Sequence, residues 1–168
     1  MKTLIVYYSY DGNCALVAGR LAAALKADTL RLETTEAKRR SGLAKYAWGG
    51  RMVFSRASPA LKPYTVKPEN YDLIVIGFPV WAGSPAPPVR SFLSETKLDH
   101  RKIALFCCHG GGKGRALQKA RALLEGNAIA GEADFVNPSR GDPARIAARI
   151  DEWAKRLGGG GGGAEFGG

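Results

Sequence analysis

The hydrophobic and polar positions of this 168-residue chain switch repeatedly between two patterns. Continuous apolar runs, such as Leu73–Gly77 and Ile103–Cys108, are typical of parallel strands whose two faces are covered by helices. Apolar residues three or four positions apart, as in Ile146, Ile150 and Trp153, indicate helices. The predicted strands are Thr3–Tyr8, Thr29–Glu33, Leu73–Gly77, Ile103–Cys108 and Glu132–Val136. The predicted helices are Asn13–Leu25, Leu43–Phe54, Pro87–Glu95, Gly112–Leu124 and Pro143–Leu157.

This alternation predicts one doubly wound α/β domain of three layers over residues 1–157. Asp142 before Pro143 is a typical helix start, and Gly158 is expected to end that helix. The segment 158–168, which opens with six glycines, is expected to be a flexible tail outside the fold. Residues 35–70 are long for a connection, so a short helix and a proline-rich return are expected there.

A polar turn, Ser9–Cys14, joins the first strand directly to the first helix. A helix N-terminus gathers unpaired N–H groups and the positive end of the helix dipole, which together attract an anion. Ser9 and Asn13 could add side-chain donors, and Gly12 allows a tight turn beside a ligand. An ordinary strand–helix turn capped by Asp11 or Asn13 is the alternative.

Two further loops follow the third and fourth predicted strands. In Pro79–Ala82, Trp81 either stacks on a planar ligand or plugs the end of the core. In Cys108–Gly112, three consecutive glycines either admit a flat ring close to the backbone or form a flexible turn. Because parallel strands end at one edge of the sheet, all three loops should meet there. Such an edge suits an elongated ligand that has a phosphate and a planar heteroaromatic ring.

The sequence of these loops resembles the flavodoxin-like family. Tyr8–Cys14 is similar to its phosphate loop, usually Ser/Thr-x-Thr-Gly-Asn-Thr, and Gly77–Ala82 and Cys108–Gly112 to its two isoalloxazine loops. The resemblance extends from Met1 to about Leu157 and implies a five-stranded parallel sheet of order 2-1-3-4-5. It also implies the cofactor FMN. The residues implied to bind FMN are Ser9, Tyr10, Asp11, Gly12, Asn13, Cys14, Pro79, Val80, Trp81, Ala82, Cys108, His109, Gly110, Gly111 and Gly112.

Two residues of the phosphate loop depart from the family pattern. Asp11 stands where a hydroxyl is usual, and a carboxylate about 4 Å from a phosphate costs a few kcal/mol, so Asp11 should point into solvent or act as a cap. Cys14 replaces a threonine, and the lost hydrogen bond costs about 1 kcal/mol. Binding of FMN is therefore expected to be weaker than in a protein that holds it permanently.

The charge of the chain is unusual for this family. The chain has 25 lysine and arginine residues and 15 acidic residues. The segment from Glu36 to Lys67 contains eight of these cations and a single acid, Glu36. Electron-carrying flavodoxins are typically acidic, so a different partner is expected, either a redox protein or NAD(P)H. The alternative is that the basic segment is only a solvated face. Nucleic acid is an unlikely partner because no binding motif accompanies the charge.

The remaining composition limits location and chemistry. No apolar run reaches the length of a membrane span and no signal peptide is visible, so a cytoplasmic protein is expected. Cys14, Cys107 and Cys108 are then reduced thiols, and Cys107 and Cys108 are more consistent with packing than with catalysis. His109 is either a solvated loop residue or, when protonated, a group that modulates the flavin. A binding module that has lost flavin and holds another phosphorylated ligand is the alternative function.

Overall fold

The protein is a three-layer α/β sandwich. The computed structural model describes residues 1–35, 58–159 and 165–166. Its sheet has the order β2-β1-β3-β5-β6-β7, with the short β4 paired to β3. The strands are β1 Thr3–Tyr7, β2 Asp28–Arg31, β3 Leu73–Trp81, β4 Ser84–Pro85, β5 Lys102–His109, β6 Ala128–Val136 and β7 Glu165–Phe166. The five main strands are parallel, which confirms the predicted order 2-1-3-4-5.

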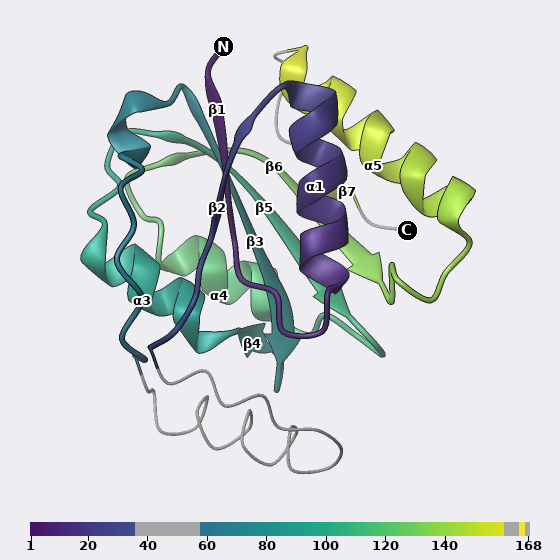
Figure 1. Ribbon diagram of the computed structural model, residues 1–168, viewed down its shortest axis with the longest axis horizontal. Helices are drawn as coiled ribbons and strands as arrows, with labels where there is room; N and C mark the ends of the chain where they lie inside the picture. The colour runs from purple at the N-terminus through teal and green to yellow at the C-terminus, as the bar shows by residue number, and fades with distance from the viewer. Residues whose placement is uncertain (36–57, 160–164, 167–168) are drawn as a thin grey trace.

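The helices cover both faces of the sheet (Figure 1). They are α1 Asn13–Leu25, α3 Pro87–Glu95, α4 Ala116–Ala122 and α5 Pro143–Gly158, together with the 3-10 turn η1 Pro68–Asn70. Helices α1 and α5 pack on one face, where Trp153 meets Phe106 and Phe135. Helices α3 and α4 pack on the other face against alternate strand residues such as Ile76 and Leu105. Each central strand is therefore buried on both sides, which explains the continuous apolar runs.

Several elements differ from the sequence-based prediction. Strand β6 begins at Ala128 rather than Glu132, and the short strands β4 and β7 were not predicted. Strand β3 continues past Gly77 to Trp81, because a two-residue turn folds the chain back and pairs Trp81 with Ser84 in β4. The turn residues Ala82 and Gly83 both have positive φ, as tight hairpins require. Helix α4 begins at Ala116 rather than Gly112, because the backbone at Gly112 (φ 153°) and Gly114 (φ 52°) is not helical.

The C-terminal part of the described chain consists of helix α5 and the short strand β7. Helix α5 starts at the predicted cap, since the Asp142 carboxylate accepts the N–H groups of Ala144 and Arg145. The helix includes Gly158 as its last residue. Residues Glu165–Phe166, which belong to the segment expected to lie outside the fold, pair with β6. The helix predicted at Leu43–Phe54 and most of the basic segment lie outside the described residues. Among the described helices, none is long and apolar enough to cross a bilayer.

Candidate functional site

The phosphate-loop candidate turns at Gly12, which is the N-cap of α1 with a φ of 95°. Gly12 occupies the cap position in place of Asp11 or Asn13, since residues other than glycine rarely adopt this backbone conformation. Asp11 lies one residue before the cap, and its carboxylate accepts the Asn13 N–H at 3.3 Å at the start of the helix. Ser9 Oγ accepts the Ala15 N–H at 3.1 Å. Within the described part of the chain, the N–H of Cys14 has no acceptor. This N–H is a donor that an anion at the helix N-terminus could use.

The Cys14 side chain faces the core, away from this turn. It is fully buried with Cys108, and burial raises the pKa of the Cys14 thiol well above its usual value, helped by a hydrogen bond with Cys108. Burial likewise raises the pKa of Cys107. Such thiols are poor nucleophiles, which supports packing over catalysis for these residues. At the turn, Cys14 offers its backbone N–H and not its side chain.

Trp81 joins the second loop to the first. Its ring lies 5.9 Å from the ring of Tyr8 and 5.7 Å from that of Tyr10, edge to face in both pairs. Trp81 is half-buried, whereas Tyr8 is buried, and burial raises the pKa of Tyr8 to about 12. The two tyrosines therefore hold the partly exposed indole of Trp81 beside the phosphate-loop candidate. In this position Trp81 could either stack on a planar ligand or close the end of the core.

The glycine loop lies open beside this aromatic group. A Cβ placed on Gly111 or Gly112 would meet no atom within 4 Å, so packing within the protein does not require glycine there. A Cβ on Gly114 would lie 3.3 Å from Cα of Gly83 in the turn after Trp81. The second and third loops are therefore in contact. Glycines without a packing role leave room for a flat ligand against the backbone.

The loop after β6 completes the edge, and the sequence analysis missed it. Asn137 Nδ2 donates to the carbonyl of Gly110 at 3.3 Å, and the N–H of Ser139 donates to Asn13 Oδ1 at 2.9 Å. One loop thus holds both the glycine loop and the phosphate loop. The other loops were found as turn residues that follow a parallel strand. The same rule applies to Asn137-Pro138-Ser139, which follows β6.

A cation from β2 also reaches the edge. The guanidinium of Arg31 donates to the Ser9 carbonyl at 3.4 Å, beside the phosphate loop. Arg31 pairs in register with Tyr7, the last residue of β1, so its position follows from the parallel sheet. The sequence analysis did not single it out, because a lone arginine at a strand end has no distinguishing pattern.

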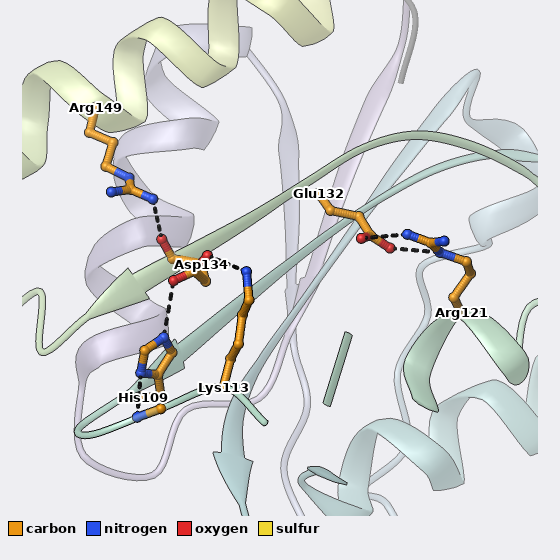
Figure 2. A network of polar contacts seen from close by, with 7 residues as sticks. His109, Lys113, Arg121, Glu132, Asp134 and Arg149 are labelled. Atoms are coloured by element: carbon orange, nitrogen blue, oxygen red, sulfur yellow. Dashed lines mark hydrogen bonds and ion pairs between the residues drawn. The ribbon is translucent and has the colours of Figure 1, made fainter. Parts of the chain in front are cut away.

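Beneath the glycine loop lies a network of charged side chains (Figure 2). His109 Nε2 lies 3.1 Å from Asp134 Oδ2, and Lys113 Nζ lies 3.0 Å from Asp134 Oδ1. The side chains of His109 and Asp134 are only 8% and 7% exposed. Burial alone would raise the pKa of Asp134, but hydrogen bonds from Lys113 and His109 outweigh it and lower that pKa. The interpretation of His109 as a solvated loop residue is therefore wrong.

The fold places the protein among doubly wound α/β proteins, a class in which ligands generally bind at the carboxyl edge of the sheet. Residues 2–137 match the model of the family described as Flavodoxin, so the chain belongs to the flavodoxin family. No curated protein matches the chain.

Solved structures share this fold. A flavoprotein from Lactobacillus acidophilus NCFM in complex with FMN is 24% identical, with a TM-score of 0.72 over 92% of this chain and 99% of that one. Oxidised flavodoxin 2 from Bacillus cereus is 15% identical, with a TM-score of 0.58 over 95% and 99%. The Streptococcus pneumonia TIGR4 flavodoxin is 14% identical, with a TM-score of 0.60 over 95% and 99%.

Proposed function

We propose that the protein binds FMN at the carboxyl edge of its sheet and transfers electrons through it. The observation that carries this proposal is the direct contact between loops. Tyr10 touches Trp81, Asn13 bonds to Ser139, and Asn137 bonds to Gly110, so anion donors, an aromatic ring and open glycines lie together. The flavoprotein from L. acidophilus, which has the same fold, is described in complex with FMN.

The residues present fit this cofactor. The Cys14 N–H and the side chains of Ser9 and Asn13 are suited to hold the phosphate, and Arg31 adds positive charge nearby. The indole of Trp81 offers aromatic contact to the ring, and the open side of Gly111 and Gly112 admits it against the backbone. A bound flavin supplies the capacity to accept and return electrons, whereas the protein supplies binding, orientation and electrostatics.

The proposed electron donor follows from charge. A net charge of +10 favours an acidic redox protein or a phosphate-bearing nicotinamide cofactor, NAD(P)H, over the basic partners of acidic flavodoxins. Association with such a donor should slow as salt rises, because screening acts over about 10 Å at 0.1 M. The proposal therefore includes two roles, an electron carrier and an NAD(P)H-linked flavin oxidoreductase, within the cytoplasm.

Flavin titration tests the proposal. Purified protein is titrated with FMN and with riboflavin, followed by flavin fluorescence and absorbance, and saturable binding of FMN with a perturbed flavin spectrum is expected. Bound FMN should then be reduced by NADPH or by a reduced acidic redox protein in stopped-flow measurements. Protein that binds neither flavin would overturn the proposal.

The alternative is a phosphate-binding module without redox activity, and the departure of Asp11 and Cys14 from the family's phosphate loop motivates it. The Asp11 carboxylate accepts the Asn13 N–H beside the position proposed for the FMN phosphate, which weighs against tight binding of that phosphate. Protein that rejects both flavins but binds another phosphorylated compound, in the same competition format, would establish this second function.

A further inference from the structure

The hydrogen bonds of His109 define which ring nitrogen carries the proton. The N–H of Gly112 donates to His109 Nδ1 at 3.1 Å, so Nδ1 presents a lone pair and no proton. The proton of the neutral ring must then lie on Nε2, where it is donated to the Asp134 carboxylate. His109 therefore joins the loop backbone on one side to a buried acid on the other (Figure 2).

The charges that face His109 come from three elements. Asp134 on β6 is ionised near neutral pH, because hydrogen bonds lower its pKa despite burial. Lys113, in the loop after β5, shares that carboxylate, and Arg149 on α5 donates to the Asp134 carbonyl at 3.0 Å. Cys107, on the same strand as His109, is a buried thiol with a raised pKa and stays neutral. The charged groups around His109 are thus one carboxylate, which it contacts directly, and two cations that contact the same aspartate.

We propose that His109 is a positioning residue whose neutral form latches the glycine loop, and that proton uptake at Nδ1 opens this latch. Once Nδ1 carries a proton, two N–H groups face each other and the Gly112 N–H loses its acceptor. The loop can then move, because Gly111 and Gly112 pack against no neighbouring atom at the Cβ position. The bond between Asn137 and Gly110 remains as the hinge of the loop.

This latch deepens the proposed function, on which its consequence for flavin rests. A glycine loop fixed in advance loses less conformational freedom when a ring binds against it. Protonation of His109 should therefore weaken binding of oxidised flavin by about fivefold, the equivalent of one hydrogen bond. By linkage, bound flavin should lower the proton affinity of His109 by the same factor.

The first test uses the protein without flavin. Nitrogen-15 NMR should show His109 protonated at Nε2 at high pH. As the pH is lowered and His109 takes up a proton, the Gly112 amide should change in shift and exchange faster with solvent. His100, whose side chain is 88% exposed, serves as the internal control, and its protonation should leave the Gly112 amide unaffected. A Gly112 amide that does not follow His109, or a proton on Nδ1 at high pH, would overturn the latch whether or not the protein binds flavin.

The second test separates the two ring nitrogens by substitution. His109→Asn places an amide oxygen near the position of Nδ1, so it keeps the acceptor for Gly112 and cannot titrate. His109→Gln places an amide nitrogen near Nε2, so it keeps the bond to Asp134 and loses the acceptor. Riboflavin affinity is measured, because riboflavin has no phosphate to titrate.

The latch predicts that riboflavin binding to H109N loses its pH dependence. H109Q should bind riboflavin about fivefold more weakly than H109N at every pH. Equal affinities for both variants, or an unchanged pH dependence in H109N, would refute the latch. If neither the wild type nor a variant binds flavin, the proposed function fails, and the NMR measurement alone decides on the latch.

Discussion

Gly77 in β3 lies directly against the ring of Phe106 in β5. The two residues are register partners, and a Cβ on Gly77 would lie 2.0 Å from Cζ of Phe106. Phe106 is fully buried and packs edge to face with Phe135 and Trp153, so its ring cannot move without disturbing both. The glycine is therefore required by packing within the sheet and not by a turn or a ligand.

Gly77→Ala should destabilise the protein by about 1–3 kcal/mol, because overpacking forces the ring or the strand to shift. Gly19→Ala is the matched control. Gly19 is exposed within α1, and its Cβ would meet no atom within 4 Å. This control should stabilise the protein by about 0.5–1 kcal/mol through helix propensity. Urea unfolding measures both, and equal effects of the two substitutions would contradict the packing role of Gly77.

Arg121→Ala should destabilise the protein by about 2–3 kcal/mol. Arg121 on α4 holds the Glu132 carboxylate with two hydrogen bonds of 3.0 and 2.7 Å, and the Glu132 side chain is only 4% exposed. Removing the cation leaves a buried charge, which costs about 3–5 kcal/mol in a fully buried pair, and less here because Arg121 is half-exposed. Arg156→Ala, which breaks an exposed pair with Glu152, should change the unfolding free energy by less than about 0.5 kcal/mol.

Asp134 should make the free energy of unfolding decrease at acidic pH. Because its pKa is lower in the folded protein than in the unfolded chain, it stabilises the fold above its ordinary pKa. This stabilisation is lost as the pH falls through the folded pKa. Asp134→Asn should therefore destabilise the protein at neutral pH, and its difference from the wild type should shrink from about pH 5 downward. Asp151→Asn, at the exposed ion pair with Arg20, should show a smaller pH-dependent difference in the same denaturation series.

Asp11→Asn should tighten FMN binding by roughly tenfold and leave riboflavin binding unchanged. The amide oxygen can still accept the Asn13 N–H, while the negative charge beside the phosphate is removed. A unit charge about 4 Å away is worth about 1 kcal/mol in water and more in partly buried surroundings. Glu125→Gln, at the opposite edge of the sheet, is the charge-matched control and should have no effect in fluorescence titrations. An equal gain for riboflavin would show that Asp11 acts on stability and not on the phosphate.

Trp81→Ala should weaken binding of both flavins by about 1–3 kcal/mol, through lost aromatic contact. Trp81→Phe keeps a ring against Tyr8 and Tyr10 and should recover part of that affinity. Isothermal titration of each variant with riboflavin measures the effect. Unchanged affinity in the alanine variant would leave Trp81 as a plug of the core.

The pattern of apolar residues was sufficient to predict the five main strands and the four described α-helices, because burial on both faces of a parallel strand leaves a visible run such as Ile103–Cys108. The order of the strands came from the family resemblance. The apolar pattern could not predict that β3 continues to Trp81, since that extension depends on the tight turn at Ala82-Gly83. Glycine, proline and tryptophan marked three loops by their unusual composition. Asn137 and Ser139 also follow a parallel strand, so their position could have been predicted. Their contacts to Gly110 and Asn13 could not, because these residue types do not differ from those of an ordinary turn.

The orientation of individual side chains was the least predictable part of the site. Cys14 occupies a position where the family usually has a hydroxyl, yet its thiol packs against Cys108 because the helix turns that face toward the sheet. His109 can be buried because its side chain forms a hydrogen bond with Asp134, which lies 25 residues later on the neighbouring strand β6. Such pairings depend on strand register, which no local spacing reveals.

The hydrogen bond between Ser139 and Asn13 links residues 126 positions apart. Because a chain is synthesised from its N-terminus, Asn13 can form this hydrogen bond only after nearly the whole domain has been made. Cofactor uptake should therefore follow completion of the chain rather than accompany it. A chain ended before residue 139 would contain every residue of the sequence motifs and still lack the contact that orders the first of them.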